Sequence, residues 1–263
     1  MKIATWNVNS IRTRLEHVTQ WLTDTSVDVL CLQETKVVDE SFPRSPFTDL
    51  GYHVYIYGQK SYNGVALLSR TPLENVSMGF APEVADVDAD LEEQKRVIAA
   101  DFQGYRIVNL YVPNGSSVGS DKYDYKLRWF KVLHRYLQSL LAAQPQVLVC
   151  GDFNIAPEDR DIHDPKGREK QVMATEAERQ ALQAIADLGF ADAFRKFNQE
   201  DGQFSWWDYR AAAFRRDLGW RIDLHYLSPP LYERAIACTI DKAPRKLEKP
   251  SDHAPVTVEL TDS

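Results

Sequence analysis

Carboxylate and amide side chains stand where apolar, strand-like runs of this chain end. The residues that close or follow four such runs are Asn7, Glu34, Tyr111 with Asn114, and Asp152 with Asn154. If these runs are strands of packed sheets, their ends can share one rim. Oxygen-rich groups gathered at one rim could bind a cation and activate a water molecule for hydrolysis.

Two further sets of polar groups lie where later apolar runs begin. Asp223 lies inside residues 221–224, and Asp252 and His253 come just before residues 254–258. If these strands run opposite to the others, all of these side chains can reach the same rim. A carboxylate inside an apolar strand is costly unless it is partnered, so Asp223 predicts a base, cation or donor nearby, and His253 is the natural candidate.

Each of these residues alone also has a purely structural interpretation. Asp152 and Asn154 could form an Asx-type turn, Asp252 could cap a loop, and Glu34 could be a solvated strand end. The whole set contains no cysteine ligand, no His-x-x-His spacing and no glycine-rich phosphate loop, which disfavours zinc and mononucleotide sites. Oxygen ligands favour Mg²⁺ or Mn²⁺, and that chemistry suits phosphoryl esters.

The elements that must position these groups are mostly strands. The apolar runs with strand character are residues 3–6, 27–32, 54–57, 65–68, 97–102, 106–112, 147–150, 222–227 and 255–260. They alternate with helices in some places and follow one another in others, which predicts an α/β (α+β) fold of two packed mixed sheets flanked by helices. We expect a single domain over residues 1–263, because no stretch has the character of an interdomain linker.

Three helices are predicted from apolar spacing and end signals. Residues 11–22 and 125–141 carry apolar side chains at the spacing of a helix with one buried face. A third helix is expected from Thr175, an N-cap with Glu178 three residues on, to Leu188, and Gly189 follows as its stop.

The composition, with 44% hydrophobic and 26% charged residues, is that of a globular protein and excludes disordered and fibrous classes. The net charge of −7 argues at first against a nucleic-acid partner. Residues 83–93 hold six acids and no base, however, so the rest of the chain carries only −1. Basic clusters at residues 121–136 and 210–221 permit a phosphate-bearing partner without requiring one.

Hydropathy and cysteine usage predict the cellular setting. No run approaches the roughly 18 apolar residues of a membrane span, and the N-terminus turns polar too early for a signal-peptide core. The three cysteines are an odd number, and Cys31 and Cys150 lie inside apolar runs. We therefore expect a cytoplasmic protein with no membrane association, no disulfides and no zinc.

Six short segments stand out along the chain: Thr-Trp-Asn-Val-Asn at 5–9, Leu-Gln-Glu-Thr-Lys at 32–36, Tyr-Val-Pro-Asn at 111–114, Gly-Asp-Phe-Asn at 151–154, Gly-Trp-Arg-Ile-Asp at 219–223 and Ser-Asp-His at 251–253. Together, and in this order, they resemble the signature segments of the exonuclease III family of abasic-site endonucleases. The resemblance implies the four-layered α/β sandwich of the endonuclease/exonuclease/phosphatase superfamily. It also implies a Mg²⁺-dependent DNA-repair nuclease that cuts 5′ to abasic sites, with 3′-to-5′ exonuclease and 3′-phosphatase or phosphodiesterase activity.

The resemblance also implies roles for the rim residues. Glu34 resembles the principal metal ligand, with Asn7 and Asp252 completing the site directly or through water. Asp152 resembles the family's general base or water-positioning carboxylate, and a second ion would use Asp152 and Asn154. The other implied catalytic roles are phosphate contact by Tyr111, phosphate or nucleophile contact by Asn154, and orientation of His253 by Asp223. One metal or two, and Asp152 or His253 as the base, stay open.

DNA contacts are implied for a second group of residues. Trp206, Trp220 and Ile222 would line a pocket for a flipped-out, base-free deoxyribose, although three core aromatics under a surface loop is the structural alternative. Arg210 lies in a loop that would press into the minor groove. Asn114 is expected at the DNA, and Arg168 and Gln171 align with residues that hold backbone phosphates in relatives.

The expected partner is therefore double-stranded DNA with abasic or 3′-blocked sites, bound by a monomer. One alternative keeps the metal chemistry and changes the substrate to an inositol phosphate or a phospholipid headgroup. Another alternative is a non-catalytic DNA-binding scaffold.

Overall fold

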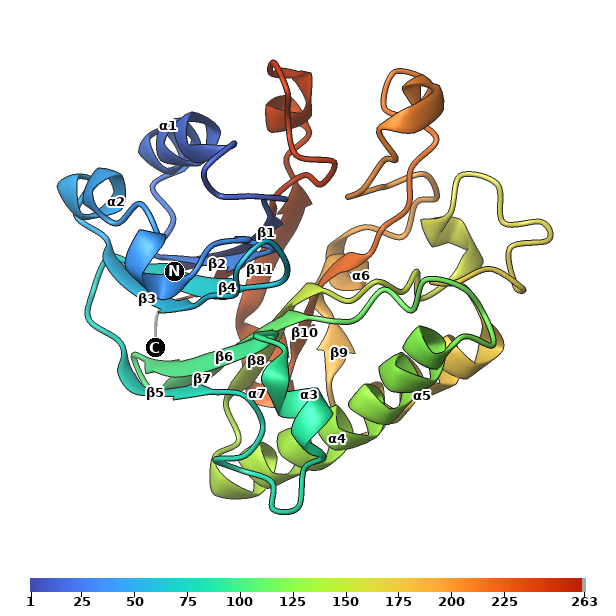
Figure 1. Ribbon diagram of the computed structural model, residues 1–263, viewed down its shortest axis with the longest axis horizontal. Helices are drawn as coiled ribbons and strands as arrows, with labels where there is room; N and C mark the ends of the chain where they lie inside the picture. The colour runs from blue at the N-terminus through green and yellow to red at the C-terminus, as the bar shows by residue number, and fades with distance from the viewer. Residues whose placement is uncertain (262–263) are drawn as a thin grey trace.

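Two six-stranded sheets packed face to face form the centre of the computed structural model, which describes residues 1–261 (Figure 1). Helices cover the outer surface of each sheet, so the molecule has four layers (Figure 1). The predicted α/β sandwich of two mixed sheets flanked by helices is confirmed.

The first sheet has the strand order β11-β12-β1-β2-β4-β3. Its strands are β1 (Lys2–Asn7), β2 (Val29–Gln33), β3 (His53–Tyr57), β4 (Val65–Ser69), β11 (Ala235–Ile240) and β12 (Val256–Leu260). Only β1 and β2 run parallel here, joined by helix α1 (Leu15–Thr25), and β12 runs antiparallel to β1. The end of β1 and the loop before β12 therefore meet at one rim.

The second sheet has the order β5-β6-β7-β8-β10-β9. Its strands are β5 (Glu74–Met78), β6 (Val97–Phe102), β7 (Tyr105–Tyr111), β8 (Val147–Asp152), β9 (Ala191–Asp192) and β10 (Asp223–Leu227). The parallel pair β7 and β8 is joined by the long helix α4 (Asp121–Ala143), and β10 returns antiparallel to β8. The same rim thus receives the ends of β7 and β8 and the start of β10.

Three apolar clusters hold the layers together. The cluster between the sheets contains residues of both, such as Val29 and Leu148. Helix α1 and the short helix α2 (Ser45–Asp49) pack on the outer face of the first sheet, and α4 and α5 (Glu176–Ala186) pack on that of the second. The remaining short helices are α3 (Ala89–Glu93), α6 (Ala193–Phe197) and α7 (Pro229–Arg234).

Polar contacts cross the largely apolar interface between the sheets, and Asn109 makes three of them. Asn109 of β7 is fully buried, and its Nδ2 donates hydrogen bonds to the carbonyl oxygens of Leu32 and Ala66, both at 2.9 Å. Its Oδ1 accepts a hydrogen bond from Nε2 of Gln33 at 2.7 Å. Because buried polar groups need partners, these bonds fix how the second sheet sits against β2 and β4.

All nine predicted runs contain strands, and the predicted helices are present with shifted ends. The first helix begins at Leu15 and not at Ile11. The third begins after Thr175, whose side chain and that of Glu178 form the expected capping box, and ends at Ala186. Three strands were not predicted: β5 and β9 are short or polar edge strands, and β11 is an edge strand with two exposed positions, so none shows clear alternation.

Two further observations concern the cysteines and the character of the helices. Cys31, Cys150 and Cys238 are free and buried. Across residues 1–261, no helix combines the length and the apolar character that a membrane span requires.

Candidate active site

Three predicted site residues form a row at the rim of the second sheet. Tyr111 lies opposite Asp152 across β7 and β8, and Asp152 lies opposite Asp223 across β8 and β10. Residues in register point to the same face of a sheet, so the three side chains are neighbours. Gly151 lets this row form, because a Cβ there would lie 1.9 Å from the carbonyl oxygen of Leu110.

The first sheet contributes Asn7 and Glu34 to the same place. Asn7, the last residue of β1, is fully buried, and its Nδ2 donates hydrogen bonds to Glu34 Oε1 at 2.8 Å and to Asp152 Oδ2 at 2.9 Å. Glu34 directly follows β2 and has a left-handed φ of 50°. The amide of Asn7 therefore holds together two carboxylates that come from different sheets.

His253 makes the expected contact with Asp223. Its Nδ1 lies 2.9 Å from Oδ2 and 3.1 Å from Oδ1 of Asp223, and the hydroxyl of Ser205 donates to Asp223 Oδ2 at 2.7 Å. Nε2 of His253 faces Asp152, with 3.7 Å to Oδ2. Burial lowers the pKa of His253, but the carboxylates of Asp223 and Asp152 outweigh burial and raise it to about 10, so the ring is an imidazolium at neutral pH.

Asp152 is held by several hydrogen bonds. Besides Asn7, the backbone N–H of Asn154 donates to its Oδ1 at 2.9 Å, and Nδ2 of Asn154 lies 3.3 Å from Oδ2. Burial raises the pKa of Asp152 to about 7; His253 opposes this shift and the nearby Asp223 carboxylate adds to it. The carboxylate therefore changes charge close to neutral pH.

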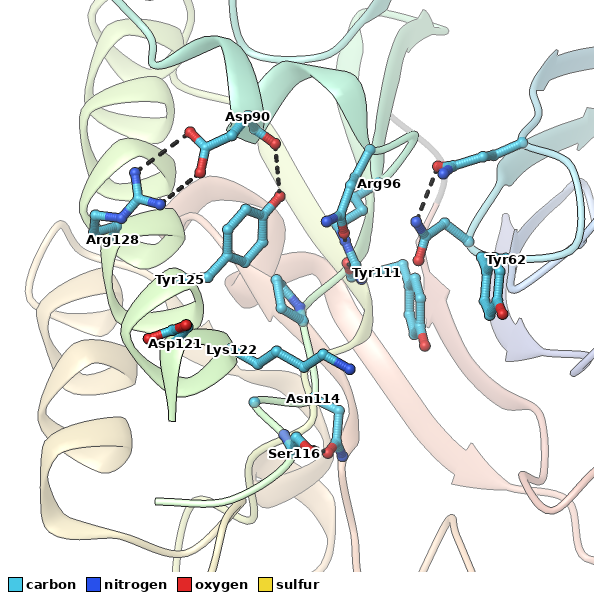
Figure 2. A pocket seen from close by; sticks show the side chains of 15 residues that line it. Tyr62, Asp90, Arg96, Tyr111, Asn114, Ser116, Asp121, Lys122, Tyr125 and Arg128 are labelled. Carbon is cyan, nitrogen blue, oxygen red and sulfur yellow. Dashed lines mark hydrogen bonds and ion pairs between the residues drawn. The ribbon is translucent and has the colours of Figure 1, made fainter. Parts of the chain in front are cut away.

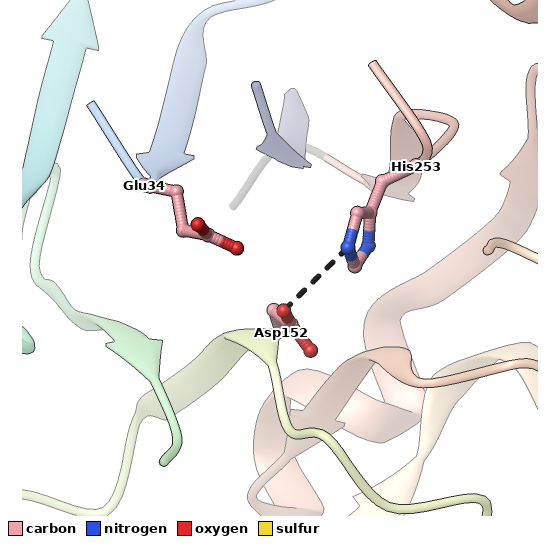
Figure 3. A group of neighbouring side chains, drawn as sticks. All are labelled: Glu34, Asp152 and His253. Carbon is pink, nitrogen blue, oxygen red and sulfur yellow. Dashed lines mark ion pairs between the residues drawn. The ribbon is translucent and has the colours of Figure 1, made fainter. Parts of the chain in front are cut away.

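A divalent cation fits between these groups. Ligand atoms of Glu34, Asp152 and His253 lie within 4.8 Å of one another, and Figure 3 shows the three side chains directed at a common centre. Asp223 adds a third carboxylate. Two cationic side chains pair with these carboxylates: His253 with Asp223, and Lys36 with Glu34, where Nζ of Lys36 lies 2.9 Å from Oε2. A cation would offset the negative charge of these clustered carboxylates, and their oxygens suit Mg²⁺ or Mn²⁺.

Asp252 lies beside this cluster, outside the three groups that share the common centre. Its Oδ1 accepts from Nδ2 of Asn9 at 3.0 Å, and its Oδ2 accepts from Nε1 of Trp206 at 3.0 Å. Burial raises its pKa, but His253, Asn9 and Trp206 outweigh burial and lower it. Because Asp252 lies outside the groups that share the common centre, it would contact the cation through water.

Tyr111, Asn114 and Asn154 flank Asp152 on the other side. Nδ2 of Asn114 donates to Oδ1 of Asn154 at 3.0 Å, and Nδ2 of Asn154 donates to the carbonyl oxygen of Val112 at 2.9 Å. Burial and the Glu34 carboxylate raise the pKa of Tyr111, so its phenol stays protonated and can donate. A guanidinium, that of Arg96, lies 4.6 Å from the centre of the Tyr111 ring.

An aromatic cavity of about 300 Å³ opens next to His253. Trp206 and Trp220 form its walls, and Arg168, Gln171 and Arg210 line it as well. Isolated antiparallel β-bridges link Trp220 to Trp206 and Trp206 to His253, so the cavity wall is joined to the rim. The remaining lining residues are His163, Val172, Met173, Asp208, Ala211, Ala213 and Leu218.

Other predicted DNA-contacting residues lie around or outside this cavity. Ile222 is buried beneath it and packs with Trp220. Side chains of Arg168 and Gln171 are hydrogen-bonded to each other at 2.8 Å, and Arg210 is exposed and paired with Asp208. Asn114 lies elsewhere.

Asn114 and Tyr111 line a larger groove of about 730 Å³ on the opposite side of the rim (Figure 2). Lys122 and Arg128 of α4 border this groove, and Arg128 is held by Asp90 at 2.6 Å (Figure 2). The exposed ring of Tyr62 stands at its edge. The rim is therefore flanked by an aromatic cavity on one side and a polar groove on the other.

Comparison with known proteins assigns the chain to a family. Residues 4–253 match the profile of the endonuclease/exonuclease/phosphatase family. The chain belongs to this family. Exodeoxyribonuclease III of Haemophilus influenzae is 35% identical to it over 99% of this chain and 100% of its own length.

Solved structures of similar proteins agree with this assignment to the endonuclease/exonuclease/phosphatase family. A 3′ phosphatase from Neisseria, solved bound to a product DNA hairpin, is 40% identical, superposes with a TM-score of 0.94 and covers 100% of both chains. An AP endonuclease from Archaeoglobus fulgidus is 41% identical, with a TM-score of 0.94 and 100% coverage of both chains.

Several residues of this family member that complete the site were given no role from the sequence. Asn9 and Lys36 lie within the quoted segments, and Nζ of Lys36 donates to Oδ1 of Asn9. Lys126 and Glu178 form a fully buried ion pair behind the rim. Lys126 falls within the basic cluster at residues 121–136, but its side chain is fully enclosed and cannot face a phosphate-bearing partner. Its spacing from the apolar residues of α4 was the available signal.

Proposed function

We propose that this protein is a Mg²⁺-dependent DNA-repair nuclease that hydrolyses the phosphodiester 5′ to an abasic site and leaves a 3′-hydroxyl. On the same site we place 3′-to-5′ exonuclease and 3′-phosphatase or phosphodiesterase activity. The observation that carries the proposal is the convergence of Glu34, Asp152 and the Asp223–His253 pair on one rim, beside an aromatic cavity.

Glu34 would hold the cation, with Asn7 keeping Glu34 beside Asp152 and Asp252 contributing through water, which leaves Asp152 available as a base. Asn154 is close enough to Asp152 to share a second ion. When bound, Mg²⁺ supplies positive charge against the negative charge that develops on the phosphoryl group and the departing 3′ oxygen. Mn²⁺ has the same preference for oxygen ligands and would substitute.

In this proposal Asp152 takes the proton of the attacking water. His253 is poorly suited to that task, because two carboxylates keep it protonated. Asp152 carries no proton above a pKa of about 7, and its oxygens are oriented by Asn7 and the backbone of Asn154. A base whose pKa lies near the working pH combines the correct protonation state with a useful affinity for the proton.

His253 and Tyr111 act as donors to the phosphoryl oxygens. The imidazolium of His253 is held by Asp223 through Nδ1, which leaves Nε2 at the rim as a charged donor. Tyr111 offers a neutral O–H from the neighbouring strand end. Donors fixed in a buried site stabilise charge that appears in the transition state more than they would in water.

In this proposal the aromatic cavity accounts for the selectivity for abasic sites. It is about 300 Å³ in volume, is bounded by Trp206 and Trp220, and is directly connected to the rim that holds His253. A base-free deoxyribose can be turned out of the helix at low cost and presents apolar ring surface to these walls. Arg168, Gln171 and Arg210 at the mouth would contact the DNA backbone and minor groove.

The comparisons support a DNA substrate. The similar proteins are named as an exodeoxyribonuclease III, a 3′ phosphatase solved with DNA and an AP endonuclease. Duplex DNA with abasic or 3′-blocked sites is thus the substrate class we propose, bound by a monomer in the cytoplasm. The groove lined by Tyr111, Asn114 and Lys122 gives the DNA strand a path away from the rim.

One assay tests this function against its two alternatives. The purified protein is incubated with a duplex that carries a single abasic analogue, with Mg²⁺ or with chelator, and with inositol phosphates in parallel. Metal-dependent incision 5′ to the analogue is expected. Release of phosphate from inositol phosphates without incision would favour the phosphoesterase alternative, and tight duplex binding without turnover would favour the non-catalytic scaffold.

A further inference from the structure

A buried ammonium lies directly behind the two asparagines of the rim. Lys126 belongs to the first half of α4, and its side chain is completely enclosed. Its Nζ lies 2.7 Å from the carbonyl oxygen of Asn154, 3.2 Å from that of Asn114, and 2.5 Å from Oε1 of Glu178. An ammonium has three N–H donors, so each donor has one acceptor here.

Glu178 is equally enclosed and connects the ammonium to a second part of the site. Its Oε2 accepts from the backbone N–H and the hydroxyl of Thr175, at 3.1 and 2.7 Å, and its Oε1 accepts from the N–H of Met173 at 3.0 Å. Met173 lines the aromatic cavity. The ion pair therefore lies between the asparagines of the rim and the wall of the cavity.

Lys126 contacts the backbone of a residue whose donors orient Asp152. Asn154 has a left-handed φ of 49°, a conformation that asparagine adopts more readily than most residues with a Cβ. Its N–H and its side-chain amide, together with the amide of Asn7, are the donors that orient Asp152. The N–H and the carbonyl of Asn154 belong to two peptide units that meet at its Cα, so the contact from Lys126 to the carbonyl restrains the residue from which both Asn154 donors project.

The Lys126–Glu178 ion pair contributes more to positioning its neighbours than to the stability of the fold. Desolvation makes a buried ion pair a weak source of stability, and replacing both partners together is often nearly neutral. The three hydrogen bonds are directional, however, and no apolar side chain can replace them. Burial lowers the pKa of Lys126, but the Glu178 carboxylate, and more weakly that of Asp152, favour its charged form.

We infer that Lys126, held by Glu178, is a positioning residue for the hydrolytic reaction: it fixes the backbone of Asn154 and Asn114 and thereby aims Asp152, without touching the substrate. This inference rests on the proposed nuclease function. Lys126, although it lies outside the rim, should therefore affect kcat and leave the affinity for DNA unchanged.

The test compares three variants with the parent protein on the abasic duplex. Lys126→Met removes the donors and leaves Glu178 unpaired, whereas the double variant Lys126→Met/Glu178→Gln removes both charges and keeps the cap acceptor. Arg106→Met is the matched control, because Arg106 is a buried, ion-paired cation of β7 at the far end of the sheet. Each variant is measured for kcat, KM and melting temperature.

We expect kcat to fall about 100-fold in Lys126→Met with KM within about threefold of the parent, the size of loss that a misplacement of about 1 Å causes. The double variant should recover most of the lost melting temperature and none of the lost kcat. Arg106→Met should lose stability and keep its kcat. If kcat recovers together with the melting temperature, or if only KM changes, Lys126 is merely structural and the inference is overturned.

A second variant and a second readout secure the result. If the Met variants do not fold, Lys126→Arg keeps the charge but presents a planar set of donors, and it should still lower kcat at least about tenfold; a parent-like kcat would overturn the inference. The side-chain amide signals of Asn154 and Asn114 in the NMR spectrum of the DNA-free protein should shift in every Lys126 variant and stay unchanged in Arg106→Met. A parent protein that does not incise the duplex would instead refute the proposed function, while unshifted amide signals would refute the positioning role alone.

Discussion

Nδ1 of His253 lies 2.9 Å from Oδ2 of Asp223, although His253 precedes a strand of the first sheet and Asp223 begins a strand of the second. The contact thus crosses between the layers. It also fixes the ring so that Nε2, and not Nδ1, faces Asp152. Orientation and charge of the imidazole therefore depend on one carboxylate.

Asp223→Asn should lower kcat for incision at least about 100-fold, because the amide can neither hold the imidazolium charge nor enforce the same ring orientation. Affinity for the abasic duplex, measured with chelator present, should stay within about threefold of the parent. Asp187→Asn, the same charge change on the exposed end of α5, is the control and should leave kcat unchanged. Near-normal turnover of Asp223→Asn would remove the pair from the mechanism.

The free energy of unfolding of the metal-free protein should depend on Asp152 in a defined pH range. Its pKa is raised from 3.8 to about 7, so the contribution of its protonated form to stability is complete below about pH 3.8 and is lost as the pH rises through 7. Asp152→Asn should therefore raise the stability by about 1–2 kcal/mol near pH 9 and by much less near pH 5. Thermal unfolding with chelator at both pH values checks this, and an equal gain at both would contradict the raised pKa.

Glu34→Gln should weaken the affinity for Mg²⁺ at least about tenfold, because it removes a charged oxygen ligand from the cation site. The Mg²⁺ concentration at half-maximal incision and the Mg²⁺-induced rise in melting temperature should both shift. Glu259→Gln provides the matched control, since Glu259 pairs with Lys2 at the opposite end of the first sheet. An unchanged Mg²⁺ requirement would exclude Glu34 as a ligand.

Trp220→Ala should reduce the preference for abasic sites at least about tenfold, because it removes one wall of the cavity beside His253. The measured quantity is the ratio of kcat/KM for abasic incision to kcat/KM for removal of a normal 3′ nucleotide. If the ratio stays at the parent value, the cavity does not select the lesion.

The rim could be predicted because chemical type and strand position agree there. Asp223 stands in an apolar strand, where an unpartnered carboxylate is costly, and the predicted contact with His253 is present. Glu34 and Asp152 follow buried strands, and the strand ends meet as expected. By contrast, strand β5 is polar and partly exposed, and edge strands of this kind lack the alternation that periodicity detects.

Lys126 and Glu178 could not be recognised by residue type, because lysine and glutamate are ordinarily surface residues. The evidence lay in position: Lys126 falls on the same face of α4 as Phe130 and Leu133. Glu178 was predicted as a helix cap and serves as one, but its second contact, with Lys126, depends on the packing of α4 against α5. Contacts between helices are set by tertiary structure and leave no local pattern.

Asn109 limits how this molecule can admit a substrate. Its amide makes three hydrogen bonds to the first sheet from within an apolar layer, and sliding the sheets apart would strand all of them at a cost of roughly 1–3 kcal/mol each. The layers therefore behave as a rigid platform, and room for a bent or opened duplex has to come from the loops above it. Conformational changes on DNA binding should be confined to segments such as residues 205–218, while the strands beneath them keep their positions.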